Sequence, residues 1–204
     1  MPYFPFFQNI DRQPGLVVGG GTVALRKIKK LLPFGPQLTV IAPRISPDLR
    51  ILPGLTLLER PFLPGDEANM SFVIAATDHR DINREISLRC QQARIPVNVV
   101  DDPELCSFIF PALVQNGDLT VGISTGGSSP TAAICLKEQI QQMIPEHFDE
   151  ILEFLHTQRE FIRENCPTES ARHHILRRLF FAAVEAGRPL HEEEVCALCK
   201  EDLQ

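Results

Sequence analysis

Three consecutive glycines constrain the fold of this chain more than any other feature of its sequence. An apolar run at 15–18 leads directly into Gly19, Gly20 and Gly21, and apolar side chains then recur at helical spacing up to residue 32. This order predicts a buried strand, a tight turn and a helix. Glycines allow a turn to approach a pyrophosphate closely, and the helix start after it offers unpaired N–H groups. We therefore predict a dinucleotide site on this glycine turn; a strand–helix turn without a ligand is the alternative.

Apolar runs after the glycine turn predict the rest of a sheet. Four further strands are expected, at residues 38–41, 55–58, 71–76 and 97–100. A helix is expected at 79–93, and strands and helices alternate throughout this stretch. Such alternation indicates an α/β fold with a Rossmann-like parallel sheet and right-handed crossovers.

The pattern changes after about Pro111. One more strand is expected at 119–123, followed by a turn and a helix, and no strand candidate appears beyond it. Three further helices are expected, at residues 147–164, 169–186 and 191–203. We therefore predict three parts: a nucleotide-binding domain at 1–112, a short middle segment at 113–145 and a helical C-terminal domain at 146–204.

The composition excludes several classes of function. A formal net charge of −6 argues against nucleic acid as the main partner, because phosphate contacts need a basic surface. No apolar run approaches the roughly 18 residues that cross a bilayer, and the aromatic N-terminus lacks the features of a signal peptide. We therefore expect a cytoplasmic protein with no membrane partner. Cys196 and Cys199 form a CxxC pair without further partners, so no metal site is predicted.

The end of the second strand leaves the type of cofactor open. A dinucleotide fingerprint normally places an acid about 20 residues after the glycines, where it binds the adenosine ribose. Here the strand ends in Ala42, Pro43 and Arg44, with no acid. Arg44 favours the 2′-phosphate of NADP, whereas backbone groups at Pro43 and Arg44 would hold the ribose of NAD.

Four motifs, in order along the chain, resemble a single family. They are residues 16–27, 75–78 with Asn83, 98–111 and 123–130. Together they resemble the dehydrogenase domain of siroheme synthases, the precorrin-2 dehydrogenase family, some members of which are also sirohydrochlorin ferrochelatases. The resemblance covers roughly residues 1 to 145, and four ordered motifs are far more specific than one glycine turn.

The resemblance implies an NAD-dependent oxidation of precorrin-2 to sirohydrochlorin, in siroheme or cobalamin biosynthesis. It implies NAD rather than NADP, held by Gly19, Gly20, Gly21, Thr22, Val23, Pro43, Arg44, Ala76 and Thr77. It also implies a homodimer joined through the segment at 113–145. The chain ends before any methyltransferase domain, so a separate methyltransferase is expected upstream in the pathway. Chelation of Fe²⁺ into sirohydrochlorin is left open by the residues, and a non-catalytic NAD-sensing module is the alternative function.

An aspartate after the fifth strand is the expected catalytic residue. In the resembling family the aspartate after Asn-Val-Val acts as the base, and here it is Asp101. Its position agrees, because ligand crevices of open parallel sheets lie beyond the carboxyl ends of the strands. Asp102 is the competitor, and two adjacent carboxylates on a strand end point to opposite sides. Both residues are alternatively loop caps, since Asp before Pro is common in turns.

Two other clusters are candidates for binding the carboxylates of precorrin-2. Ser124, Thr125, Gly126 and Ser128 are predicted to hold them with hydroxyls and with N–H groups at a helix start; a plain helix N-cap is the equal alternative. Basic residues also cluster on one predicted helix, namely Arg172, His173, His174, Arg177 and Arg178. That cluster is either a wall of the substrate site or a solvated charged face.

Overall fold

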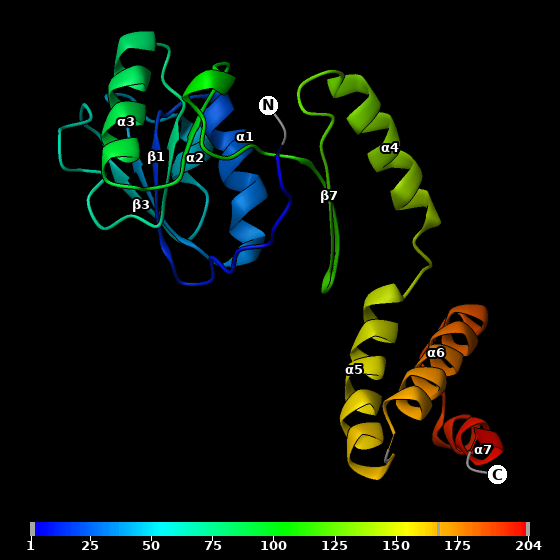
Figure 1. Cartoon of the computed structure of the whole chain (residues 1–204). Coiled ribbons are helices and arrows are strands. Elements are labelled where there is room, and N and C mark those ends of the chain that lie inside the picture. The colour runs from blue at the N-terminus through cyan, green and yellow to red at the C-terminus, as the bar shows by residue number, and fades with distance from the viewer. Residues whose placement is uncertain (1–2, 167, 203–204) are drawn as a thin grey trace. The chain divides into compact units, whose positions relative to one another are not determined.

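The glycine turn follows the central strand of a parallel sheet. A computed structural model describes residues 3–166 and 168–202. Residues 6–110 form one compact unit, drawn in blue to green in Figure 1. Its strands are all parallel and lie in the order β3-β2-β1-β4-β5: β1 (Pro14–Val18), β2 (Gln37–Ile41), β3 (Leu55–Leu58), β4 (Phe72–Ala75) and β5 (Val97–Val99). The predicted Rossmann-like fold is thereby confirmed.

Helices cover both faces of this sheet. α1 (Thr22–Leu31) and the short α2 (Pro47–Arg50) bury their apolar side chains on one face, and α3 (Arg80–Gln92) does so on the other. Ile28 of α1 and Ile86 of α3 are completely buried in these two cores. All of β4 is buried, as expected for a strand with helices on both faces.

The expected alternation of strands and helices is only partly correct. β2 connects to β3 through one turn of helix, α2, and β3 connects to β4 through turns alone. Pro61, Pro64 and Gly65 lie in this second connection, and residues of these two types disfavour helix formation. Two short 3₁₀ helices, η1 (Leu32–Phe34) and η2 (Pro103–Leu105), complete the unit.

The second compact unit contains residues 3–5 and the described residues from 111 onward. It begins with an antiparallel hairpin of β6 (Ala112–Asn116) and β7 (Leu119–Ile123), in which Val114 pairs with Val121. α4 (Pro130–Met143) packs against this hairpin. The sequence predicted β7 and α4 but not β6. The missed signal is Gly117 followed by Asp118, the two residues of the hairpin loop, where Gly117 has a φ of +53°.

Three further helices share a core of their own in this unit. They are α5 (Phe148–Asn165), α6 (Glu169–Ala186) and α7 (Glu192–Asp202), all three predicted from the sequence. Their core contains Ile151, Ile162, Cys166, Ile175, Leu179, Ala183 and Leu190. The predicted end of the last helix, at residue 203, lies outside the described residues. No helix within the described ranges is long and apolar enough to span a membrane.

Candidate functional site

The loops that leave the carboxyl edge of the sheet are joined by backbone hydrogen bonds. The N–H of Ala76, after β4, donates to the carbonyl oxygen of Val18 on β1 (2.7 Å). The N–H of Val100, after β5, donates to the carbonyl oxygen of Ala75 on β4 (2.9 Å). Parallel pairing thus continues into the loops. The glycine turn and the loops after β4 and β5 therefore belong to one edge, where ligands of such sheets bind.

The three glycines of the turn serve different purposes. Gly19 has a φ of +135°, and a Cβ there would collide with the carbonyl oxygen of Ala76. A Cβ on Gly20 would collide with the carbonyl oxygen of Arg44. Gly21 has an ordinary φ of −95°, and a Cβ on it would meet no atom within 4 Å. Packing therefore requires the first two glycines, whereas the third leaves open space in front of the helix.

The N-terminus of α1 faces this open space without a cap. The first helical hydrogen bond runs from the N–H of Leu25 to the carbonyl oxygen of Gly21 (3.0 Å), which leaves the N–H groups of Thr22 and Val23 outside the helical pattern. In the described structure no side chain caps this end, and its first turn holds no acid. An anion fits here, because the N–H groups and the helix dipole both favour negative charge.

The loop after β4 is fixed by a buried amide. Asn83 of α3 is only 5% exposed, and its Oδ1 accepts hydrogen bonds from the backbone N–H (3.2 Å) and the Oγ1 (2.7 Å) of Thr77. Its Nδ2 donates to the carbonyl oxygen of Thr77 (2.9 Å). These three bonds hold the predicted cofactor residues Ala76 and Thr77 in one conformation. Pro43 and Arg44, after β2, are both exposed.

Asp101 lies in a turn and not on a strand end. β5 ends at Val99, and Asp101 has a φ of +60°, a left-handed conformation that Asp adopts more readily than most residues. The expectation that Asp101 and Asp102 point to opposite sides assumed extended backbone, and it does not apply to this turn. Asp101 is exposed, and its carboxylate makes no hydrogen bond within the described residues. Asp102 is partly buried and precedes η2, which its side chain does not cap.

A lysine that the sequence did not single out connects α1 with β5. Lys27 Nζ donates to Oδ1 of Asn98 (3.2 Å) and lies 3.9 Å from the centre of the Phe110 ring. Asn98 is 5% exposed, and its Nδ2 donates to the carbonyl oxygen of Phe108 (2.9 Å). Burial, followed by repulsion from Lys30, lowers the pKa of Lys27 to about 8, although Asp101 acts in the opposite direction.

Cys106 contacts the backbone on both sides of the turn that contains Asp101. Its Sγ accepts a hydrogen bond from the N–H of Val99 (3.1 Å) and lies 3.3 Å from the carbonyl oxygen of Asp102. Burial raises the pKa of the Cys106 thiol, so it stays protonated at neutral pH and can donate to the carbonyl oxygen of Asp102 or to that of Val99 (3.2 Å). The turn that contains Asp101 is therefore anchored at both ends while its carboxylate faces solvent.

The loop at 124–129 belongs to the second unit and is ordered by its own hydroxyls. Thr125 Oγ1 donates to the carbonyl oxygen of Ser129 (3.0 Å), and Ser129 Oγ accepts from the N–H of Ala132 (3.1 Å), which caps α4. Ser124 Oγ accepts from the N–H of Gly126 (3.1 Å). Capping thus falls to Ser129, and Ser128 remains exposed.

Residues 6–112, which contain this edge of the sheet, match the family described as "Putative NAD(P)-binding". The chain belongs to this NAD(P)-binding family. The match covers the sheet, the glycine turn and the Asp101 turn, and it ends at the first residue of β6. Among the described residues, no group of three or more His, Cys, Asp or Glu side chains is arranged to hold a metal ion.

Curated relatives and a solved structure extend the similarity to nearly the whole chain. A siroheme synthase of Pseudomonas paraeruginosa is 37% identical over 202 residues, which cover 96% of this chain and 43% of that protein. Siroheme synthase 3 of Aeromonas hydrophila is 38% identical over 185 residues, covering 89% and 40%. The structure of SirC, precorrin-2 dehydrogenase, matches with a TM-score of 0.69 at 24% identity and covers 99% of this chain and 98% of its own. The resemblance inferred from four motifs is confirmed, and the chain spans about two fifths of these siroheme synthases.

Proposed function

We propose that this chain is an NAD-dependent dehydrogenase that oxidises precorrin-2 to sirohydrochlorin. The observation that carries the proposal is an exposed carboxylate, Asp101, in an anchored turn at the sheet edge that also carries the glycine turn. The proposal is supported by the relatives named siroheme synthase and by the fold shared with a precorrin-2 dehydrogenase. It assigns the reaction to the biosynthesis of siroheme or a related tetrapyrrole.

The cofactor in this proposal is NAD. The pyrophosphate would occupy the open space beside Gly21 and accept hydrogen bonds from the N–H groups of Thr22 and Val23. The exposed backbone at Pro43 and Arg44 would hold the adenosine ribose, and the Thr77 loop would bound the site on the other side. When bound, NAD⁺ supplies the acceptor for a hydride.

Asp101 would act as the base. The oxidation removes one hydride and one proton from the macrocycle, and a carboxylate beside the site accepts the proton. Asp101 suits this role better than Asp102, because its carboxylate is exposed whereas Asp102 is partly buried and fixed through its backbone. Carboxylates of the substrate would bind the loop of Ser124, Thr125, Gly126 and Ser128.

The second unit carries a surface that suits a homodimer. α4 leaves most of its apolar side chains exposed, including Ile134 (52%), Leu136 (46%) and Met143 (79%). A second copy of the chain would cover exposed apolar side chains of α4, in agreement with the dimerisation segment expected at 113–145. We further propose that a separate methyltransferase supplies precorrin-2 and that the reaction takes place in the cytoplasm.

Anaerobic turnover tests the proposal directly. Precorrin-2 is incubated with NAD⁺, with NADP⁺ or without cofactor, each with and without Fe²⁺, while sirohydrochlorin absorbance and NADH are recorded. Equal amounts of sirohydrochlorin and NADH are expected with NAD⁺. NAD⁺ binding without any turnover would instead identify a non-catalytic NAD-sensing module. Loss of sirohydrochlorin absorbance only when Fe²⁺ is present would reveal an additional ferrochelatase activity.

A further inference from the structure

One face of α6 carries basic groups. They recur every three or four residues, the spacing at which apolar side chains usually form the buried face of an amphipathic helix. Its core face contains Ile175 and Leu179, which are almost completely buried. The adjacent face repeats every three or four residues and holds Ser170, His173, His174, Arg177, Arg178 and Phe181. Acidic residues outnumber lysine and arginine over 146–204, so this local excess of positive charge runs against the composition of its surroundings.

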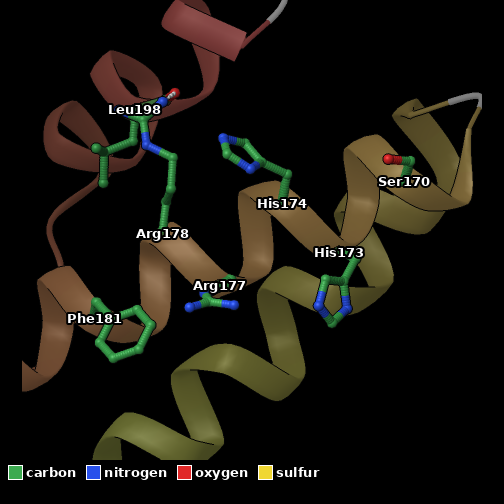
Figure 2. Close-up of a pocket in the computed structure, with 7 residues that line it drawn as sticks. All are labelled: Ser170, His173, His174, Arg177, Arg178, Phe181 and Leu198. Atoms are coloured by element: carbon green, nitrogen blue, oxygen red, sulfur yellow. Dashed lines mark hydrogen bonds between the residues drawn. The ribbon is translucent and has the colours of Figure 1, made fainter.

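These side chains line a groove of about 510 Å³ between α6 and Leu198 of α7. Its volume lies within the range of about 300–1,000 Å³ that is typical of small-molecule sites. In Figure 2, His173 and Arg177 leave α6 on the same side, while Arg178 extends toward α7. The guanidinium of Arg178 donates to the carbonyl oxygen of Leu198 (3.3 Å), which fixes one wall.

The lining combines charge with an aromatic surface. The guanidinium carbon of Arg177 lies 5.5 Å from the centre of the Phe181 ring, and that ring is 54% exposed. Arginine and histidine bind carboxylates through charge-assisted hydrogen bonds, and an exposed ring beside them favours a ligand with a carbon skeleton over a bare inorganic anion.

We propose that this groove binds an organic polycarboxylate, with its carboxylates on Arg177 and His173 and its carbon skeleton against Phe181. The site does not depend on the dehydrogenase function proposed above. If that function holds, a tetrapyrrole with its carboxylate side chains is one such ligand. Small free polycarboxylates are the second kind of ligand that the groove would bind.

Binding to the full-length chain tests this site without any turnover. Uroporphyrin, an air-stable tetrapyrrole polycarboxylate, is titrated by fluorescence, and citrate and inorganic phosphate are added as competitors. Arg177→Gln is expected to raise the Kd for uroporphyrin about tenfold, the usual effect of losing one charge-assisted hydrogen bond. The control is Arg159→Gln, an exposed arginine of α5 that does not line the groove and should leave the Kd unchanged.

NMR of the histidine rings in the groove distinguishes binding there from binding at the proposed dehydrogenase site. The ring ¹H–¹⁵N resonances of His173 and His174, assigned with His→Gln variants, should shift on addition of uroporphyrin, while those of His156 on α5 should not. Displacement by citrate would extend the ligand class to free polycarboxylates, and its absence would restrict the class to tetrapyrroles; both agree with the proposal. Displacement by phosphate but not by citrate, or equal affinity of Arg177→Gln and wild type, would overturn it, whatever the turnover assay shows.

Discussion

Lys27 Nζ lies 3.2 Å from Oδ1 of Asn98, and this contact links the helix after the glycine turn to the strand before Asp101. The two residues are 71 positions apart in the chain, so this hydrogen bond joins α1 to an edge strand that is distant in the sequence. Asn98 also holds the carbonyl oxygen of Phe108. The network fixes the cofactor helix and the segment that carries the proposed base relative to each other.

The lowered pKa of Lys27 predicts a specific pH dependence of stability. Folding lowers this pKa from 10.5 to about 8, so the unfolded chain binds the proton more tightly than the native chain does. The contribution of Lys27 to stability therefore rises as pH increases between about 8 and 10.5. Lys27→Met also leaves Asn98 Oδ1 without its donor, at a cost of about 1 to 3 kcal/mol.

Urea unfolding of wild type and Lys27→Met at pH 7.5 and pH 10 measures this effect. The difference in unfolding free energy between the two proteins should grow at pH 10, because only the wild type gains stability from the deprotonation of Lys27. An equal difference at both pH values would show that the pKa of Lys27 is not lowered by folding.

Substitutions of two neighbouring glycines should separate packing from cofactor binding. Gly20→Ala forces a Cβ against the carbonyl oxygen of Arg44 and should destabilise the fold by about 1 to 3 kcal/mol. Gly21→Ala meets open space and should change stability by less than about 1 kcal/mol, yet weaken NAD⁺ binding at least tenfold. Thermal unfolding and calorimetric titration with NAD⁺ give the two quantities. Unchanged NAD⁺ affinity in Gly21→Ala would contradict the placement of the pyrophosphate.

The amide of Asn83 should matter for both stability and cofactor affinity. Asn83→Leu removes three hydrogen bonds to Thr77 at a buried position and should cost about 2 to 3 kcal/mol. Loosening the Thr77 loop should also weaken NAD⁺ binding. Asn165→Leu, at an exposed position on α5, is the matched control and should change stability by less than about 0.5 kcal/mol. A variant of Asn83 with wild-type stability would show that this loop needs no such anchor.

The parts of the fold that the sequence predicted are those specified by local patterns. The glycine turn and the strands around it follow from short apolar runs and helical spacing, which need no knowledge of distant contacts. β6 was missed because only Val114 of its five residues is buried, so the strand lacks the apolar pattern of β4. The pairing of β6 with β7 arises from the hairpin loop between them.

The residues of the candidate site were less predictable from the sequence than the fold was. The location of Asp101 after β5 followed from sheet topology, but its left-handed turn did not, since Asp tolerates several backbone conformations. Lys27 was missed because its partners, Asn98 and Phe110, lie far away in the chain. Within the helix, Lys27 is one of several polar residues beside the apolar positions of α1, so the local pattern does not distinguish it.

The two adjacent aspartates should differ sharply in turnover. Asp101→Asn keeps the shape of the residue but removes the proposed base, so kcat for precorrin-2 oxidation should fall about a hundredfold or more with little change in the Kd of NAD⁺. Asp102→Asn should retain most of the activity, because its side chain is not the exposed one. Single-turnover absorbance at saturating NAD⁺ measures both. The reverse ranking would move the base to Asp102.

The paired serines before α4 offer a test of whether the 124–129 loop binds substrate or only starts a helix. Ser129→Ala removes the cap that accepts from the N–H of Ala132 and should destabilise the second unit by about 1 kcal/mol. Ser128→Ala removes an exposed hydroxyl that makes no such bond, so it should leave stability within about 0.5 kcal/mol of wild type. If the loop holds a substrate carboxylate, Ser128→Ala should raise KM for precorrin-2 several-fold while KM for NAD⁺ stays constant. An unchanged KM for precorrin-2 in Ser128→Ala, together with the loss of stability in Ser129→Ala, would show that the loop only starts the helix and does not bind substrate.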